Sequence, residues 1–486
     1  MSAEFIPFRT DQVFIDGQWN HADGRQTFPA VDPSTGRTFA EIARGGPSDI
    51  DRAVAAARRA LKGPWGRMSA AERGRVLHAM SRMVLDNLEM LARIECADVG
   101  KPLRQARVDA GMLARYLEFY AGATDKLHGE TIPFETGYTV LTLREPHGVT
   151  AHIIPWNYPM QIIGRSVGGA LASGNAAVLK PATEACLSAL AFARIAHDAG
   201  LPAGALNVVP GPGGEVGTSL AAHPGINHIS FTGSFATGRL IQAAAAGNVV
   251  PVALELGGKS PQLVFADADL DAALPFLVNA GIQNAGQTCT ASSRILVQRP
   301  VFDELVARMA ERYRALKVGP APDDHDVGPL VSARQRDIVT GYLAPSILGN
   351  LSVTAQSTIV SDAPRGGYYV NAALVAGVPK EHRLSHEEIF GPVQVVTAFD
   401  TEEEAIEMAN GTEYGLVAGV WTRDGGRQLR LARAIEAGQV FVNNYGAGGG
   451  VELPFGGVKH SGHGREKGFE ALYSFTKVKT VAIRHG

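Results

Sequence analysis

Cys289 is the first residue whose type and setting could support covalent chemistry. It lies in the stretch NAGQTCT (residues 284–290), between two threonines and shortly after a glycine. The chain has three cysteines, an odd number, and no two of them have CxxC spacing. A disulfide framework and a metal site are therefore not expected. A lone cysteine with polar neighbours can be a nucleophile, provided that other groups activate it.

The two other cysteines have a different setting. Cys96 in RIECADVG and Cys186 in TEACLSA lie in apolar, helix-like stretches. A free cysteine in such a stretch usually packs as a small hydrophobic residue. We expect both thiols to be structural and inert, because a buried thiol without activating neighbours stays protonated.

Three polar residues could complete a site around Cys289. Glu255 directly follows the apolar run VAL, where burial would raise its pKa and suit a general base, although a strand-end salt bridge is the alternative. Asn157 in PWNYP could donate an N–H to an oxyanion or could simply form a turn beside proline. Lys180 ends the apolar run AAVL and could meet a cofactor ribose or phosphate, or only solvent.

The elements that carry these residues form an alternating pattern. From about 147 to 265, apolar bursts alternate with alanine-rich helical stretches, which is typical of a parallel sheet that is buried on both faces. Short glycine-rich and polar segments follow these apolar stretches. They would lie at the carboxyl ends of the strands, where a parallel sheet of this kind binds its ligands. A similar alternation between about 262 and 445 predicts a second α/β domain. The fold class is thus α/β.

Other segments extend this framework. Ser69 and Glu72 form a capping box that predicts a long helix, with an apolar stripe from Val76 to Leu91 and a stop at Gly100. Residues 125–146 and 472–486 have the pattern of extended β segments. Residues 343–365 are weakly patterned and receive no assignment.

Composition limits the classes of function. A chain of 486 residues suggests two or three domains, and its net charge of −3 gives no electrostatic reason to bind nucleic acid or acidic membranes. The first residues lack a signal-peptide pattern, and no run of about 18 apolar residues predicts a membrane span. With few cysteines, a reducing cytoplasm is the expected compartment.

Seven motifs together resemble the aldehyde dehydrogenase superfamily. They occur in the family's order and cover nearly the whole chain. The motifs are PWNYP (155–159), KPAT (180–183), FTGS (231–234), ELGGK (255–259), GQTC (286–289), EEIFGP (387–392) and PFGGVKHSGHGRE (454–466).

The resemblance implies a reaction and a role for each candidate. Cys289 would attack an aldehyde as the thiolate, while the Asn157 amide and the Cys289 backbone N–H hold the oxyanion of the thiohemiacetal. Hydride transfer to NAD(P) would leave a thioester, which water activated by Glu255 hydrolyses to a carboxylic acid. Lys180 also belongs to the implied catalytic set, and it would contact the adenosine ribose of the cofactor.

The resemblance also implies NAD as cofactor, with NADP possible. A glutamate three residues after the lysine excludes NADP in this family, whereas here the position holds Thr183 and Glu184 is displaced by one. NAD with weakened exclusion of NADP is therefore expected. The implied cofactor residues are Ile154, Pro155, Trp156, Lys180, Thr183, Gly213, Phe231, Gly233, Ser234, Leu256, Gln335, Glu388 and Phe390.

The family's domains map onto the chain as three parts. They are a Rossmann-like dinucleotide-binding domain (1–124 and 147–257), a catalytic domain (258–459) and a small β oligomerisation segment (125–146 and 472–486). A homo-oligomer, either a dimer or a tetramer, is the implied assembly.

The substrate pocket resembles no single subgroup. Arg165 occupies a position at which succinic semialdehyde dehydrogenases carry one of two arginines, but the second position is Gln283. Arg165 could bind a carboxylate-tailed aldehyde or could form an internal salt bridge. The loop 445–452 is glycine-rich where many relatives have an aromatic residue. The implied pocket residues are Tyr158, Ile162, Arg165, Gln283, Thr288, Thr290 and Phe455.

The resemblance leaves two other functions to be weighed against the residues. Acylating relatives, which pass the acyl group to coenzyme A or phosphate, generally lack the base at the first position of ELGGK, so Glu255 argues against them. Inactive structural members of the fold would be expected to lose Cys289, Asn157 or Glu255, and all three are present.

Overall fold

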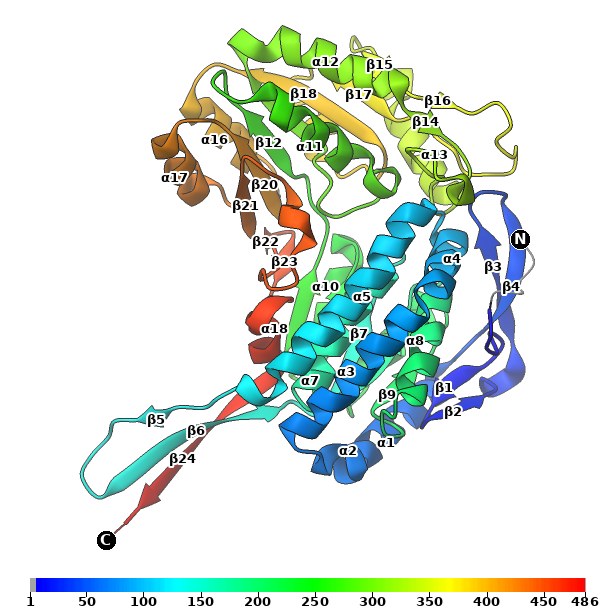
Figure 1. The fold of residues 1–486 in the computed structure, drawn as a ribbon, viewed down its shortest axis with the longest axis vertical. Helices are drawn as coiled ribbons and strands as arrows, with labels where there is room; N and C mark the ends of the chain where they lie inside the picture. The colour runs from blue at the N-terminus through cyan, green and yellow to red at the C-terminus, as the bar shows by residue number, and fades with distance from the viewer. Residues whose placement is uncertain (1–5, 486) are drawn as a thin grey trace.

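The computed structural model describes residues 6–485 and contains two large β-sheets (Figure 1). The strands of the first sheet are β1 (Val13–Ile15), β2 (Gln18–Asn20), β7 (Val149–Ile153), β8 (Ala176–Lys180), β9 (Leu206–Val208), β10 (His228–Thr232), β11 (Val252–Glu255) and β23 (Gly462–His463). Their spatial order is β2-β1-β9-β8-β7-β10-β11-β23.

The five strands from β9 to β11 are parallel, as the alternation of apolar bursts and helices predicts. The chain leaves β7 for β8 and β9 on one side and then returns to β10 and β11 on the other. Such a reversal opens a crevice beyond the carboxyl ends of the strands. The helices that follow these strands are α6 (Pro159–Ile162), α7 (Gly168–Ala172), α8 (Leu187–Asp198), α9 (Thr218–Ala222) and α10 (Phe235–Ala246).

The second sheet confirms the second α/β unit. Its strands are β12 (Pro261–Val264), β13 (Arg294–Gln298), β15 (Ala355–Gln356), β17 (Ala373–Ala376), β18 (Val393–Phe399), β20 (Val417–Trp421) and β21 (Gln439–Val442), and all but β15 pair in parallel. Their spatial order is β15-β17-β18-β13-β12-β20-β21. Apolar residues of this sheet and its helices form cores separate from that of the first sheet. The helices here are α11 (Leu270–Ile282), α12 (Phe302–Ala315), α13 (Ala333–Tyr342), α15 (Arg383–His386), α16 (Glu402–Asn410) and α17 (Gly425–Ala434).

A group of N-terminal helices packs beside the first sheet (Figure 1). Ser69 and Glu72 form the predicted reciprocal cap. The single long helix predicted beyond it is wrong, because the helix ends before Asn87, whose side-chain amide donates to the Met83 carbonyl at 2.8 Å. An asparagine side chain that bonds the backbone in this way competes with helix continuation. The helices are α1 (Pro47–Lys62), α2 (Pro64–Arg67), α3 (Ala70–Asp86), α4 (Leu88–Val99) and α5 (Leu103–Ala123).

A three-stranded sheet extends away from the rest of the molecule (Figure 1). It consists of β5 (Thr131–Ile132), β6 (Tyr138–Pro146) and β24 (Thr476–Arg484). β24 pairs antiparallel with β6 from Thr476 to Arg484, so the two extended segments predicted from the sequence meet in one sheet.

The unassigned residues 343–365 contain short elements. α14 (Pro345–Leu348) is followed by β15 and by β16 (Thr358–Ile359), which pairs with β14 (Lys317–Val318). The remaining elements are β3 (Thr27–Asp32), β4 (Arg37–Ala43), β19 (Tyr414–Gly415), β22 (Val458–Lys459) and α18 (Gly468–Ser474). Within residues 6–485, none of the helices combines the length and apolarity that a membrane span needs.

Candidate active site

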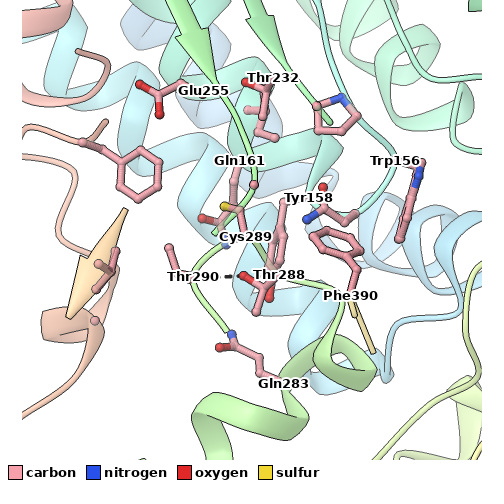
Figure 2. Close-up of a pocket in the computed structure, with 18 of the residues that line it drawn as sticks. Trp156, Tyr158, Gln161, Thr232, Glu255, Gln283, Thr288, Cys289, Thr290 and Phe390 are labelled. Atoms are coloured by element: carbon pink, nitrogen blue, oxygen red, sulfur yellow. Dashed lines mark hydrogen bonds between the residues drawn. The ribbon is translucent and has the colours of Figure 1, made fainter. Parts of the chain in front are cut away.

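A cavity of about 720 Å³ is lined by residues of both large sheets and of the loops that follow their strands. Figure 2 shows Cys289 in the middle of its side chains, with Glu255 on one side and Trp156 and Phe390 on the other. Seven predicted substrate residues line this cavity: Tyr158, Ile162, Arg165, Gln283, Thr288, Thr290 and Phe455. The structure therefore brings together segments of the chain that lie far apart in the sequence.

The loop before Cys289 has an unusual backbone. Asn284 (φ 50°), Ala285 (φ 55°) and Gly286 (φ 70°) are all in the left-handed region. Each non-glycine residue held there costs about 1–3 kcal/mol. The side-chain amide of Asn284 offsets this by donating to the carbonyls of Asn157 (3.0 Å) and Gln287 (3.3 Å). The loop is thus fixed to PWNYP.

Two motif glycines are required by close contacts at Cys289. A Cβ on Gly286 would lie 2.2 Å from the carbonyl oxygen of Gly391, and one on Gly258 would lie 2.5 Å from the carbonyl oxygen of Cys289. Side chains at either position would push ELGGK, GQTC and EEIFGP apart. The glycines of these motifs therefore allow three loops to converge on one sulfur atom.

Cys289 is partly exposed to the cavity and packs against an apolar cluster of Leu416, Val417 and Phe455. Burial raises the pKa of its thiol to about 11, and the positive charge of Arg165 opposes that rise. Since the thiolate is the nucleophile, this thiol must lose its proton before it can attack.

Asn157 follows β7 and presents its amide to the same loop. Its side-chain N–H donates to the carbonyl of Gln287 at 3.0 Å. A carboxamide has two N–H donors, so this bond orients the group and uses only one of them. The residue is buried and lines the cavity with Cys289.

Glu255 is the last residue of β11 and is 1% exposed. Neither carboxyl oxygen has a hydrogen-bond partner among the described residues. Burial raises the pKa of this carboxyl well above its usual value, and the charge of Arg165 opposes the rise. A strand-end salt bridge, the alternative interpretation of Glu255, is absent from residues 6–485, and the carboxyl group lines the cavity instead.

Arg165 lies in a π-helical turn, Ile163–Val167, that joins α6 to α7. Its guanidinium lies 2.5 Å from the carboxylate of Glu466 and donates to the Thr232 hydroxyl at 3.1 Å. Both members of the ion pair are buried. Arg165 therefore lines the cavity but already has a carboxylate partner, as in the second of its two sequence interpretations.

A second group of predicted residues lies on the other side of Cys289. Trp156 packs edge-on against Phe390 with ring centroids 5.3 Å apart, and Gln335 donates to the Phe390 carbonyl at 2.9 Å. The Gly258 N–H donates to Glu388 at 2.9 Å, while burial raises the pKa of this carboxyl to about 7. Eight predicted cofactor residues line the cavity: Pro155, Trp156, Gly233, Ser234, Leu256, Gln335, Glu388 and Phe390.

The other predicted cofactor residues lie outside the cavity lining, near the ends of β7, β8, β9 and β10. Lys180 ends β8 and packs within 4.0 Å of the Cβ position of Gly217, and burial lowers the pKa of its amine. The Thr183 hydroxyl donates to the Gly211 carbonyl at 3.5 Å. These contacts place Lys180, Thr183 and the turn that begins at Gly213 together, whereas Ile154, just after β7, and Phe231, in β10, are buried.

The sequence patterns gave no role to two residues of the site, Glu466, which pairs with Arg165, and Lys467. Glu466 is the last residue of the final motif, and Lys467 lies just beyond it. Lys467 lines the cavity and donates from its amine to the Gly449 carbonyl at 2.8 Å. No local pattern distinguishes a buried lysine from a surface one, so a lysine after a glycine-rich motif gave no signal.

Comparisons with known proteins agree with this site. The model of the aldehyde dehydrogenase family matches residues 19–481. The human protein "Aldehyde dehydrogenase, mitochondrial" is 40% identical over 479 residues, which cover 98% of this chain and 92% of that protein. A crystal structure from Burkholderia cenocepacia assigned as an aldehyde dehydrogenase is 63% identical, with a TM-score of 0.97 over 98% of this chain and 100% of that chain.

A third relative carries the cofactor. The NAD⁺ complex of aldehyde dehydrogenase from Bacillus cereus is 37% identical, with a TM-score of 0.95 over 99% of this chain and 98% of that chain. The fold, the seven motifs and these likenesses lead to one assignment. The chain belongs to the aldehyde dehydrogenase family and is an NAD(P)-dependent oxidoreductase that acts on aldehydes.

Proposed function

We propose that this enzyme oxidises an aldehyde to its carboxylic acid through covalent attachment to Cys289. The thiolate of Cys289 adds to the carbonyl carbon, and the resulting oxyanion accepts the second N–H of Asn157 and the backbone N–H of Cys289. The bond from Asn157 to Gln287 supports this role, because it fixes the plane of the amide. NAD, when bound, supplies the acceptor for the hydride of the thiohemiacetal.

Loss of that hydride leaves a thioester on Cys289, which water must hydrolyse. Glu255 accepts the proton of the attacking water, the C–S bond breaks, and the carboxylic acid leaves. The balanced reaction consumes aldehyde, NAD⁺ and water and forms acid, NADH and a proton. The observation that carries this proposal is the unpartnered, buried carboxyl group of Glu255 in the same cavity as Cys289.

A panel of aldehydes tests the proposal directly. Aliphatic, aromatic and carboxylate-bearing aldehydes are incubated with enzyme and NAD, and the absorbance of NADH is followed together with the acid formed. Equal amounts of NADH and acid are expected. Formation of NADH only when coenzyme A or phosphate is added would instead show an acylating enzyme.

The residues fit a dinucleotide at the switch point of the first sheet. The buried amine of Lys180 at the end of β8 has its pKa lowered by burial, so a polar ligand would stabilise its charged form. We propose that Lys180 and Thr183 face the adenosine ribose, that Ser234 at the start of α10 faces the phosphates, and that Glu388 and Phe390 hold the nicotinamide side.

Residue 183 controls the choice between NAD and NADP in this proposal. Thr183→Glu places a carboxylate beside the ribose. It would repel the 2′-phosphate of NADP, which carries about −1.5 to −2 charges. We expect the preference for NAD, as a ratio of kcat/KM values, to rise roughly 5- to 150-fold, or about 1–3 kcal/mol. Thr183→Gln is the matched control, since it adds similar bulk without charge. An unchanged ratio in Thr183→Glu would show that this residue does not face the ribose.

We propose that the sheet of β5, β6 and β24 joins copies of this chain into a homo-oligomer. It extends away from both large sheets, and β24 leaves one backbone edge unpaired within the described residues. It also exposes large apolar side chains, which mark association surfaces. These residues are Leu143, Val478 and Ile483 of the strands and Phe134 of the connection between β5 and β6.

Charges on this surface should prevent assembly. We expect Val478→Lys combined with Ile483→Lys to reduce the mass measured by light scattering, because two buried ammonium groups would lack partners. Lys477→Ala combined with Lys479→Ala alters polar residues of the same strand and serves as the control. A mass that is unchanged by the apolar-to-lysine pair would place the interface elsewhere.

We also infer a substrate larger than acetaldehyde and a reducing compartment. The aromatic side chains that line the cavity near Cys289, which include Tyr158, Phe441, Tyr445 and Phe455, suit medium-to-large aldehydes, aromatic or with a polar tail. All three cysteines are free thiols, which agrees with the cytoplasm.

A further inference from the structure

Lys467 is a buried cation that lines the substrate side of the cavity. It is 8% exposed, and its amine donates to the Gly449 carbonyl at 2.8 Å. In residues 6–485 no carboxylate lies within salt-bridge distance of this amine. A buried charge is normally paired, because desolvation without a counter-ion is costly. The cavity thus contains a positive charge for which the described chain supplies a carbonyl and the ring of Phe455, but no paired carboxylate.

The backbone at Lys467 is held in a conformation that lysine rarely adopts. Its φ is 63°, and Gly468 follows with a φ of 57°. A Cβ on Gly468 would lie 2.5 Å from the carbonyl oxygen of Glu452, so the turn is fixed by close packing. Strain that persists at a cavity-lining residue supports a functional role for the side chain it directs.

Neighbouring charges do not neutralise Lys467. Arg165 is paired with Glu466, and the carboxylate of Glu452 is paired with Arg115. Burial and the positive charge of Arg165 lower the pKa of Lys467 to about 8, although the charge of Glu452 partly opposes this, and the amine stays mostly protonated at neutral pH. An anion that enters the cavity would stabilise this charged form.

The apolar surface between Lys467 and the nucleophile indicates the shape of the ligand. The amine lies 5.7 Å from the ring centroid of Phe455, and Phe455 belongs to the apolar cluster that contacts Cys289. A ligand that reaches from the sulfur to the amine must therefore pass an apolar side chain. An aldehyde with a hydrocarbon chain and a terminal anion meets both requirements.

We propose that Lys467 binds a carboxylate at the far end of the substrate, so that this enzyme prefers carboxylate-bearing aldehydes. The inference rests on the proposed function, in which Cys289 receives the aldehyde end. The product is then a dicarboxylate, and the reaction that supplies the substrate must generate an aldehyde on a molecule that already carries a carboxylate. Arg165 keeps its internal partner and has no role in this selection.

The test compares an ω-oxo carboxylate with the unbranched apolar aldehyde of equal chain length. The parent, Lys467→Met, Lys467→Arg and the control Lys62→Met, which changes an exposed lysine outside the cavity, are assayed with NAD. Selectivity is the ratio of kcat/KM values for the two aldehydes. We expect Lys467→Met to reduce it about tenfold or more through KM of the oxo-carboxylate. Lys467→Arg, which retains the charge, is expected to keep most of this selectivity, and Lys62→Met is expected to keep all of it.

Two results would overturn the inference. One is a parent that shows no preference for the oxo-carboxylate, and the other is an equal loss on both aldehydes in Lys467→Met. NADH binding and the melting temperature of each variant separate these results from misfolding. If Lys467→Met does not fold, the same ratio of kcat/KM values, measured for Lys467→Arg and for Lys467→Gln, decides the question in its place. A parent that oxidises neither aldehyde would instead contradict the proposed function itself.

Discussion

Cys289→Ala is expected to abolish aldehyde oxidation, with a loss of the order of 10⁴-fold or more, as for other nucleophiles whose removal eliminates a covalent route. Without the sulfur no thiohemiacetal forms, and the remaining groups of the cavity have no intermediate to stabilise. Binding of NADH, measured by fluorescence titration, should remain nearly intact because Cys289 lies beside the cofactor residues and is not among those proposed to bind it. Turnover within about tenfold of the parent would contradict the assignment.

The other two thiols provide matched controls for this prediction. Burial raises the pKa of both Cys96 and Cys186 far above that of a free thiol, and neither lines the cavity. Cys96→Ala and Cys186→Ala should therefore each retain most activity. A large loss in either variant, with a normal melting temperature, would show that thiol chemistry in this enzyme is not confined to Cys289.

Much of the framework could be predicted from the sequence because buried parallel strands have a simple pattern. Each burst from GVTAHII to PVALELGG became a strand of the first sheet, with its polar tag at the carboxyl end. The strands at Ala373–Ala376 and Val417–Trp421 were not identified. Asn87 shows a further limit, since an apolar stripe that continues past a residue does not reveal that its side chain will interrupt the helix.

The residues that gather at the site could be predicted better than the electrostatics around them. Cys289, Glu255 and Asn157 were found from residue type and motif, and the structure places all three in one cavity. The partner of Arg165 could not be predicted, because Glu466 lies far along the chain and only the tertiary fold brings it within 2.5 Å. The same holds for the left-handed backbone of Ala285, for which alanine gives no local signal.

Glu255→Gln is expected to separate the two halves of the reaction. Glutamine has nearly the shape of glutamate but cannot accept a proton from water, so the thioester should form and then persist. We expect a burst of about one NADH per active site, followed by turnover slower by about 10²–10⁴-fold. Mass spectrometry of the quenched enzyme should find the acyl group on Cys289.

The pH dependence gives an independent check. Burial raises the pKa of Glu255 well above its usual value. Because the carboxylate is the active form, deacylation in the parent should be slow at low pH and increase as pH rises through this raised pKa. The increase should be missing from Glu255→Gln.

The stability of the variant has a definite sign. In the unfolded chain Glu255 ionises near its ordinary pKa, but in the fold it holds its proton to higher pH, so the parent loses stability as pH rises between the two values. Glutamine removes that loss, and Glu255→Gln should be at least as stable as the parent at neutral pH.

A slow variant with no burst, no adduct and this normal stability would mean that Glu255 acts before hydride transfer, by taking the proton of Cys289. Burial raises the pKa of the Cys289 thiol to about 11, so the thiol, like the attacking water, needs a base to remove its proton.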